Sequence, residues 1–204
     1  MKVSKMLVFC VMMIVPTFLN AGETTSQIIK GKPVLVVMDI QNAYLPYMDE
    51  EEVESGLEMI NYVIDLFREQ GLPVIRVHHT DVERGPEVGS VAFEFPETVR
   101  VKADDPMIVK NYPSAFQKTE LEKLVQELGC DTVFLTGLSS VGCVLATYFD
   151  GLRLELTTFM VEDALISHRP DLTDAVEEIT EAVNYKAIKY MLDNARWANV
   201  DTQK

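Results

Sequence analysis

Three residues of different chemical types stand at the ends of apolar segments, and together they suit nucleophilic catalysis. Asp39 closes the run PVLVVMD, Lys110 closes PMIVK, and Cys143 follows DTVFLTG where a helix is expected to begin. A nearby ammonium and the start of a helix both lower the pKa of a thiol. A carboxylate beside both can take the thiol proton and return it to a leaving amine. This set therefore indicates acyl chemistry by a thiol, without histidine.

These three residues are expected to meet because of the elements that carry them. Five Val- and Ile-rich runs without clean alternation span residues 33–40, 72–80, 106–112, 131–137 and 156–164. Such runs are typical of strands covered on both faces. Helical patterns lie between them, which predicts an α/β fold, a three-layer α/β/α sandwich around a Rossmann-like, mainly parallel sheet. Ligands bind at the carboxyl edge of such a sheet, where these strands end.

Several local features of this sandwich are predicted from apolar spacing. Helices are indicated by two inward faces, one of Val53, Leu57, Ile60, Val63, Ile64 and Phe67, and one of Leu121, Leu124, Val125 and Leu128. Thr119 and Glu122 suggest a capping box for the second helix. A further helix is expected from Pro170 or Asp171, with an inward face of Leu172, Ala175, Val176, Ile179 and Val183. Residues 81–105 are predicted to be a long loop, and RWANVDT, which contains Trp197, a last strand.

The first 22 residues have the pattern of a signal peptide. A basic start with Lys2 and Lys5 precedes an apolar run, and small residues follow at Ala21 and Gly22. The run is too short for a confident membrane span. We therefore expect residues 23–204 to be one exported domain, periplasmic or secreted, without stable membrane association after leader removal.

The charge of the chain limits its partners. It has 32 acidic and 18 basic residues, and loss of the two leader lysines would take the formal charge from −14 to −16. Such a surface argues against nucleic acid as a partner. Only Cys130 and Cys143 lie beyond the leader, so no disulfide framework is implied.

Four segments of the chain resemble a known family. They are VLVVMDIQNAY (34–44), KNYPSAFQKTELEKL (110–124), GLSSVGCVLATYFDG (137–151) and VEDA (161–164). In this order they resemble the isochorismatase-like cysteine hydrolases, which include nicotinamidases and N-carbamoylsarcosine, ureidoacrylate and biuret amidohydrolases. The resemblance covers nearly all of the chain after the leader, and the three longer motifs together are specific.

The resemblance implies roles for individual residues. Asp39, Lys110 and Cys143 would form the catalytic triad. A cis peptide bond would lie between Leu138 and Ser139, and the amides of Ser139 and Cys143 would form the oxyanion hole. The wall of the substrate pocket is expected from residues in the same motifs: Gln41, Tyr44, Tyr112 and Phe116.

The resemblance also bears on metals, cofactors and assembly. The stretch IQNAYLPYMDEEE after Asp39 contains no histidine, so we predict no metal and no cofactor, and nicotinamide is disfavoured as the substrate. The adjacent His78 and His79 point to opposite faces of a strand, so they cannot form a metal pair, and at most one of them lines the pocket. Relatives commonly assemble, so a homo-oligomer is expected.

The resulting hypothesis is a metal-independent cysteine hydrolase that cleaves a C–N bond of a small amide or ureido substrate through a thioester. One alternative is a catalytically inactive binding protein of the same fold. A second is a thiol redox protein in which Cys130 approaches Cys143. A serine hydrolase using Ser139, Asp163 and His168 is disfavoured, because GLSSV lacks the second glycine of a nucleophile elbow.

Overall fold

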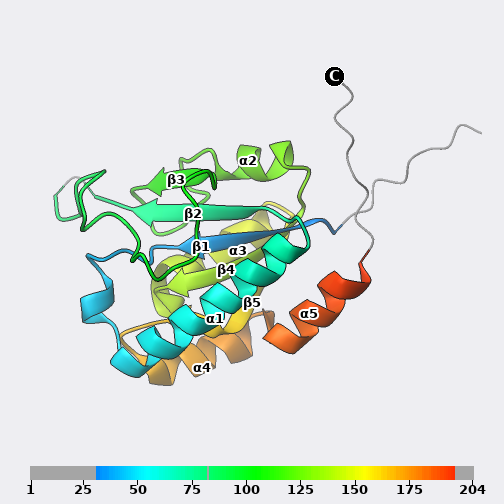
Figure 1. The fold of residues 1–204 in the computed structure, drawn as a ribbon. Coiled ribbons are helices and arrows are strands. Elements are labelled where there is room, and N and C mark those ends of the chain that lie inside the picture. The colour runs from blue at the N-terminus through cyan, green and yellow to red at the C-terminus, as the bar shows by residue number, and fades with distance from the viewer. Residues whose placement is uncertain (1–30, 82, 196–204) are drawn as a thin grey trace, which may run out of the picture.

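A computed structural model describes residues 31–81 and 83–195 of the chain. In this part all strands pair in parallel within one sheet of order β3-β2-β1-β4-β5-β6 (Figure 1). The strands are β1 (Pro33–Met38), β2 (Val74–His79), β3 (Met107–Lys110), β4 (Thr132–Leu138), β5 (Thr157–Ile166) and β6 (Ala182–Val183). The predicted α/β sandwich with a Rossmann-like parallel sheet is thereby confirmed, and each of the five predicted strands forms.

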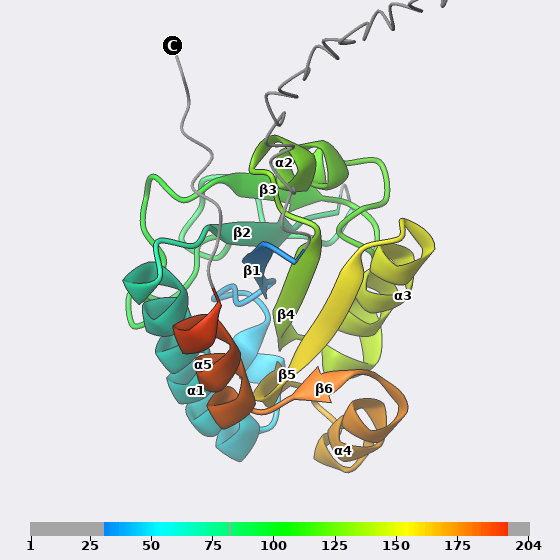
Figure 2. The same cartoon turned by 90° about the vertical axis from the view of Figure 1, so that its right-hand side faces the viewer.

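Helices cover both faces of the sheet. They are α1 (Glu50–Glu69), α2 (Leu121–Glu127), α3 (Leu145–Arg153), α4 (Pro170–Ile179) and α5 (Tyr185–Asn194). Figure 2 shows α1 and α5 on one side of the sheet and α3 on the other. None of these helices combines the length and hydrophobicity that crossing a membrane would require.

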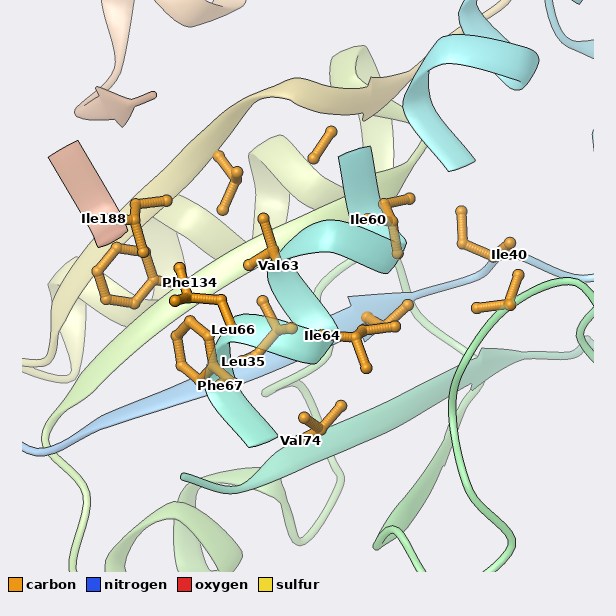
Figure 3. Close-up of a cluster of buried hydrophobic side chains, with 14 of the residues drawn as sticks. Leu35, Ile40, Ile60, Val63, Ile64, Leu66, Phe67, Val74, Phe134 and Ile188 are labelled. Carbon is orange, nitrogen blue, oxygen red and sulfur yellow. The ribbon is translucent and has the colours of Figure 1, made fainter. Parts of the chain in front are cut away.

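A hydrophobic core fills the space on each side of the sheet. Alternate residues of β1 point to opposite sides, so Leu35 packs with α1 and α5 and Val36 packs with α2 and α3. On the first side, the predicted inward face of α1 supplies Ile60, Ile64 and Phe67 (Figure 3). Covering both faces explains why β1 is apolar at every position.

Three local predictions differ from the structure. Helix α4 buries Thr173 and Val176 and exposes Leu172, Ala175 and Ile179. The reason is a polar contact, because the Thr173 hydroxyl packs on that of Ser140 at 2.9 Å and sets the inward face. Val183 lies in β6, not on the helix.

The predicted capping box at α2 is also wrong. The helix begins at Leu121, and its N-cap residue Glu120 makes no side-chain capping bond. The Thr119 hydroxyl accepts from the Leu121 N–H at 3.2 Å, and it also donates to the Ala115 carbonyl. This second bond ties Thr119 to the preceding loop.

The predicted loop over residues 81–105 has no helix or strand among its described residues. It packs beside the turn that follows β1, where the N–H groups of Asn42 and Ala43 donate to the carbonyls of Glu94 and Ala92. The predicted leader, the expected last strand RWANVDT and Trp197 lie outside the described residues.

Candidate active site

Asp39 lies directly after β1 and is buried at the carboxyl edge of the sheet. Its N–H donates to the Val77 carbonyl of β2 at 2.8 Å, so its backbone still belongs to the sheet. Its φ of 56° lies in the left-handed region, which aspartate adopts more readily than most residues. The chain turns at this point and carries Ile40 into the core. The carboxylate therefore has a fixed place at the sheet edge.

Lys110 is the last residue of β3, and its side chain reaches past the end of β2 to Asp39, which follows β1. Its ammonium nitrogen lies 2.8 Å from Asp39 Oδ2, and the two side chains are 0% and 2% exposed. The same nitrogen lies 3.1 Å from Nδ1 of His79. Burying such a pair costs desolvation energy, and a buried ion pair at a sheet edge is a candidate for function.

Cys143 lies in a π-helical turn, Ser140–Val144, that connects β4 to α3. Such turns occur frequently at functional sites. The thiol is half-buried and lies within hydrogen-bonding reach of the Asp39 and Lys110 side chains. The structure therefore brings the three predicted residues together, although they are far apart in the sequence.

The backbone before Cys143 departs from regular strand geometry. The register of β4 against β5 shifts between Leu135 and Gly137, and Gly137 has a φ of 110°. A Cβ at Gly137 would lie 2.1 Å from the Met38 carbonyl oxygen, so only glycine lets β4 approach β1 here. The cis peptide bond between Leu138 and Ser139 is present, as the resemblance implied.

Side chains around the turn hold it in place. The Thr147 hydroxyl donates to the Cys143 carbonyl at 2.7 Å and accepts from the Ala115 N–H at 2.9 Å. It thus joins the cysteine turn to the loop that follows Lys110. Ser139 Oγ donates to Ser167 Oγ at 3.5 Å, which turns this hydroxyl towards the β5–α4 connection.

Burial raises the pKa values of both the acid and the thiol. It raises the pKa of Asp39, and the charge of Lys110 opposes the shift. It raises the pKa of Cys143 to about 11; the charge of Asp39 adds to this shift and Lys110 opposes it. The expected lowering of the thiol pKa is therefore wrong in net direction, because desolvation outweighs the ammonium.

These shifts define what the site can do chemically. A thiol with a pKa of about 11 is neutral at pH 7, so it needs a base to become a nucleophile. Oδ2 of Asp39 meets the Lys110 ammonium at 2.8 Å, whereas Oδ1 has no hydrogen-bond partner among the described residues, so Oδ1 is open to a proton. A carboxylate with a raised pKa is also a better base than an exposed one. The geometry suits proton transfer from Cys143 to Asp39.

Gln41 and Tyr44 both bind the end of β2. The fully buried Gln41 accepts from the His79 N–H at 2.7 Å and donates to the His79 carbonyl at 3.1 Å. The Tyr44 hydroxyl donates to the same carbonyl at 3.4 Å. Tyr44 is half-buried, and burial together with the charge of Asp39 raises its pKa to about 12. Gln41 is thus a support for β2, and Tyr44 lies beside the triad.

The other two predicted pocket residues lie differently. Phe116 is 7% exposed and packs in the core with Ile108, so it is a core residue and not pocket wall. Tyr112 is half-buried, accepts a hydrogen bond from Lys118 Nζ at 3.0 Å, and has that ammonium 4.8 Å from its ring centroid. Its contacts therefore hold its own loop.

The two adjacent histidines have different surroundings. His78 is fully buried and stacks on Phe93 and Phe95, with ring centroids 4.7 and 4.2 Å away. His79 faces the opposite side and contacts Lys110. The motifs did not predict His79 as a neighbour of Lys110. The alternation of β2 was the available signal, because it places one of the two adjacent histidines on each face of the sheet.

The structure does not support the residue pairings of the thiol redox and serine hydrolase hypotheses. Cys130 precedes β4 at the amino edge of the sheet, and its sulfur contacts the Pro33 carbonyl. A whole strand, about 23 Å at 3.3 Å per residue, separates it from Cys143. The idea that Cys130 approaches Cys143 is therefore wrong. His168 is exposed, so it does not complete a buried serine triad.

Two cavities among the described residues lie away from this site. One of about 620 Å³ lies between α1 and α4, and another of about 540 Å³ lies under α5 at the amino edge of the sheet. Neither cavity is lined by Asp39, Lys110 or Cys143, and the site is defined by the buried, charged groups that meet there. Within residues 31–81 and 83–195, no group of three or more His, Cys, Asp or Glu side chains is arranged to hold a metal ion.

Comparison with known proteins places the chain in a family. The model of the isochorismatase domain matches residues 33–188, which is most of the chain. The chain therefore belongs to the isochorismatase family, a family of hydrolases with this α/β fold.

Individual relatives have different activities. The chain is 26% identical to a maleamate amidohydrolase of Pseudomonas putida over 71% of its own length and 76% of the relative. It is 27% identical to a protein of Arabidopsis thaliana named as a probable inactive nicotinamidase, over 69% and 84% of the two chains. A solved N-carbamoylsarcosine amidase of Thermoplasma acidophilum is 29% identical, with a TM-score of 0.65, over 75% and 95% of the two chains.

Proposed function

We propose that the protein is a cysteine hydrolase that cleaves the C–N bond of a small amide or ureido compound without a metal ion. The observation that carries this proposal is the buried contact of Asp39, Lys110 and Cys143 at the carboxyl edge of the sheet. An acid with a raised pKa, a neutral thiol and a cation in one place are the parts that thiol-mediated acyl transfer needs.

The first step is attack of the Cys143 sulfur on the carbonyl carbon. Asp39 takes the thiol proton as the C–S bond forms, because the raised pKa of the thiol leaves it neutral until then. Lys110 stabilises the negative charge that develops between them. The backbone N–H groups of Ser139 and Cys143 are assigned to the carbonyl oxygen, which becomes an oxyanion.

The remaining steps return the enzyme to its first state. Asp39 gives its proton to the leaving nitrogen, the C–N bond breaks, and a thioester on Cys143 remains. A water molecule then attacks the thioester carbonyl while Asp39 takes a proton from it. The C–S bond breaks, the acid product leaves, and the proton on Asp39 returns to the sulfur.

Two relatives support an amide as the substrate class. The maleamate amidohydrolase and the N-carbamoylsarcosine amidase are both named for C–N bond cleavage in small molecules. A second candidate function, binding without turnover, is favoured by the relative named as inactive. The intact acid, cation and thiol of this chain argue for turnover.

An ammonia-release screen tests the proposal. Wild-type protein and Cys143→Ala are incubated with small primary amides, ureido acids and biuret-like compounds. We expect release from at least one class by the wild type and none above background by Cys143→Ala, with matching circular dichroism spectra. Full turnover by Cys143→Ala would refute the mechanism, and an inert wild type across the panel would favour the binding protein.

Export and self-association belong to the same proposal. We infer that residues 1–22 direct export and that the mature chain forms a homo-oligomer. Mass spectrometry of protein expressed with its leader, followed by light scattering, tests both. A chain that keeps Met1 in the cytoplasmic fraction would contradict export, and a monomer at micromolar concentration would contradict assembly.

A further inference from the structure

A buried ammonium needs three hydrogen-bond acceptors, and the site supplies three around Lys110. Its nitrogen carries three N–H groups, and an unsatisfied one in a buried position is costly. Asp39 Oδ2 lies 2.8 Å away, and the Cys143 sulfur is within hydrogen-bonding reach. Nδ1 of His79, at 3.1 Å, is the third neighbour. These three groups lie beside the cation.

The backbone of His79 is held unusually firmly. His79 and Lys110 are direct partners in the β2–β3 register, so their Cα atoms are adjacent. The Gln41 amide binds both the N–H and the carbonyl of His79, and the Tyr44 hydroxyl binds the carbonyl again. The imidazole therefore meets the ammonium from a fixed position.

Nδ1 of His79 can accept from Lys110 only when the ring is neutral. Burial and the charge of Lys110 lower the pKa of His79 to about 4, and Asp81 opposes the shift. The neutral ring that accepts at Nδ1 carries its proton on Nε2. The charged and titratable groups beside the ring are Lys110 on β3, Tyr44 after β1 and Asp81 just beyond β2. Asp39 and Cys143 lie beside the ammonium of Lys110.

We propose that His79 is a positioning residue that accepts one hydrogen bond from the Lys110 ammonium and so directs the other two donors to Asp39 and Cys143. The inference rests on the proposed function and adds a fourth residue to its machinery. Without this acceptor, one buried N–H is unpaired, and the ammonium rotates away from its present position. This rotation moves positive charge away from the sulfur, so the thiolate of Cys143 is less stable.

Two substitutions of His79 separate the effect of its hydrogen-bond acceptor from the effect of its ring. His79→Asn places its side-chain oxygen near the position of Nδ1, so it keeps the acceptor. His79→Phe keeps a flat ring against Tyr44 and loses the acceptor. His78→Phe is the matched control, because His78 lies on the opposite face between two phenylalanines and neither ring nitrogen has a hydrogen-bond partner among the described residues.

The test is the rate of Cys143 alkylation by iodoacetamide between pH 6 and 10, read by peptide mass spectrometry. We expect His79→Phe to react about tenfold more slowly than wild type at pH 8, which is one unit in the thiol pKa. The alkylation rates of His79→Asn and His78→Phe should stay within threefold of the wild-type rate. On any amide that the wild type hydrolyses, kcat of His79→Phe should fall at least tenfold while KM changes less than threefold.

Two results would overturn the proposal. One is that folded His79→Phe is alkylated at the same rates as the wild type across the pH range. The other is that the alkylation rate falls as much in His79→Asn as in His79→Phe. The second result would mean that the ring matters for packing alone. Alkylation requires no substrate, so a wild type inert towards every amide would refute the proposed function while the alkylation rates still decide the role of His79.

Discussion

Lys110 sets the electrostatic balance of the site, because it neutralises a carboxylate that has almost no contact with water. We predict that Lys110→Met lowers the free energy of unfolding by about 3–5 kcal/mol at pH 8, the usual effect of breaking a buried pair. Urea unfolding at pH 8 measures this loss. The matched variant is the double substitution Asp39→Asn with Lys110→Met, which removes both charges and should recover most of the stability.

The loss of stability in the single variant Lys110→Met should depend on pH in a definite direction. Burial holds the folded pKa of Asp39 above its unfolded value, so the folded state binds this proton more tightly. Stability from that proton is present at low pH and is lost as pH rises through the folded pKa. Without Lys110 the folded pKa rises further, so Lys110→Met should be closer to wild type at pH 5 than at pH 8. An equal deficit at both values would contradict this account.

At the scale of residues, the sequence predicts positions better than it predicts energies. Asp39, Lys110 and Cys143 could be grouped because parallel strands end at a common edge. The raised pKa of Cys143 could not be predicted, because it depends on burial that no local motif encodes. The contact of His79 with Lys110 depends on the β2–β3 register, which is likewise absent from the motifs.

At the scale of elements, the close approach of β4 to β1 positions the cysteine turn. We predict that Gly137→Ala lowers the free energy of unfolding by more than about 3 kcal/mol or prevents folding, since its Cβ would lie 2.1 Å from the Met38 carbonyl. Gly129→Ala is the control: its φ is also positive, at 67°, but open space surrounds it. It should cost about 1–2 kcal/mol. Equal losses in thermal or urea unfolding would refute the steric argument.

Thr147 connects the element that carries Lys110 to the element that carries Cys143. Thr147→Val would leave the buried Ala115 N–H without its acceptor, so we predict a loss of about 1–3 kcal/mol in urea unfolding. Turnover should fall as well, because the cysteine turn loses a support. The control is Thr136→Val on β4, whose hydroxyl only donates to the Val36 carbonyl at 3.3 Å. A larger effect at Thr136 than at Thr147 would be inconsistent with this role.

The strands were predictable because hydrophobic burial on both faces leaves a strong local pattern. The inward face of α4 was not, because a hydroxyl pair between Ser140 and Thr173 sets it and apolar spacing does not record that contact. Strand β6 has two residues, too few to form a pattern. The capping box at α2 did not form because the helix begins at Leu121, so that Glu120, and not Thr119, is the N-cap residue.

At the scale of the whole molecule, eight of the 32 acidic residues share one cavity. Eight carboxylates line the cavity between α1 and α4, among them Glu177, whose pKa burial raises to about 7. Because the folded pKa exceeds the unfolded value of 4.5, stability is present below that value and is lost as pH rises to about 7. Net repulsion within the cavity adds to this loss.

We predict that Glu177→Gln raises the free energy of unfolding by about 1–2 kcal/mol at pH 8 and by almost nothing at pH 4.5. The full shift corresponds to roughly 3 kcal/mol, and partial solvent contact reduces it. The amide oxygen keeps the bond from the Asp163 N–H. Thermal unfolding at the two pH values measures the effect, and the exposed neighbour Glu178→Gln is the control. A Glu177 variant no more stable than the control at pH 8 would refute the prediction.

The central claim is that the sulfur of Cys143 forms a covalent bond to the acyl group of an amide. Acid-quenched mass spectrometry of the protein after mixing with each amide of the screening panel tests it most directly. We predict an acyl adduct on the peptide that contains Cys143, present in the wild type and absent in Cys143→Ala. An adduct on another residue, or turnover by the wild type with no adduct on Cys143 under a rapid quench, would contradict the account.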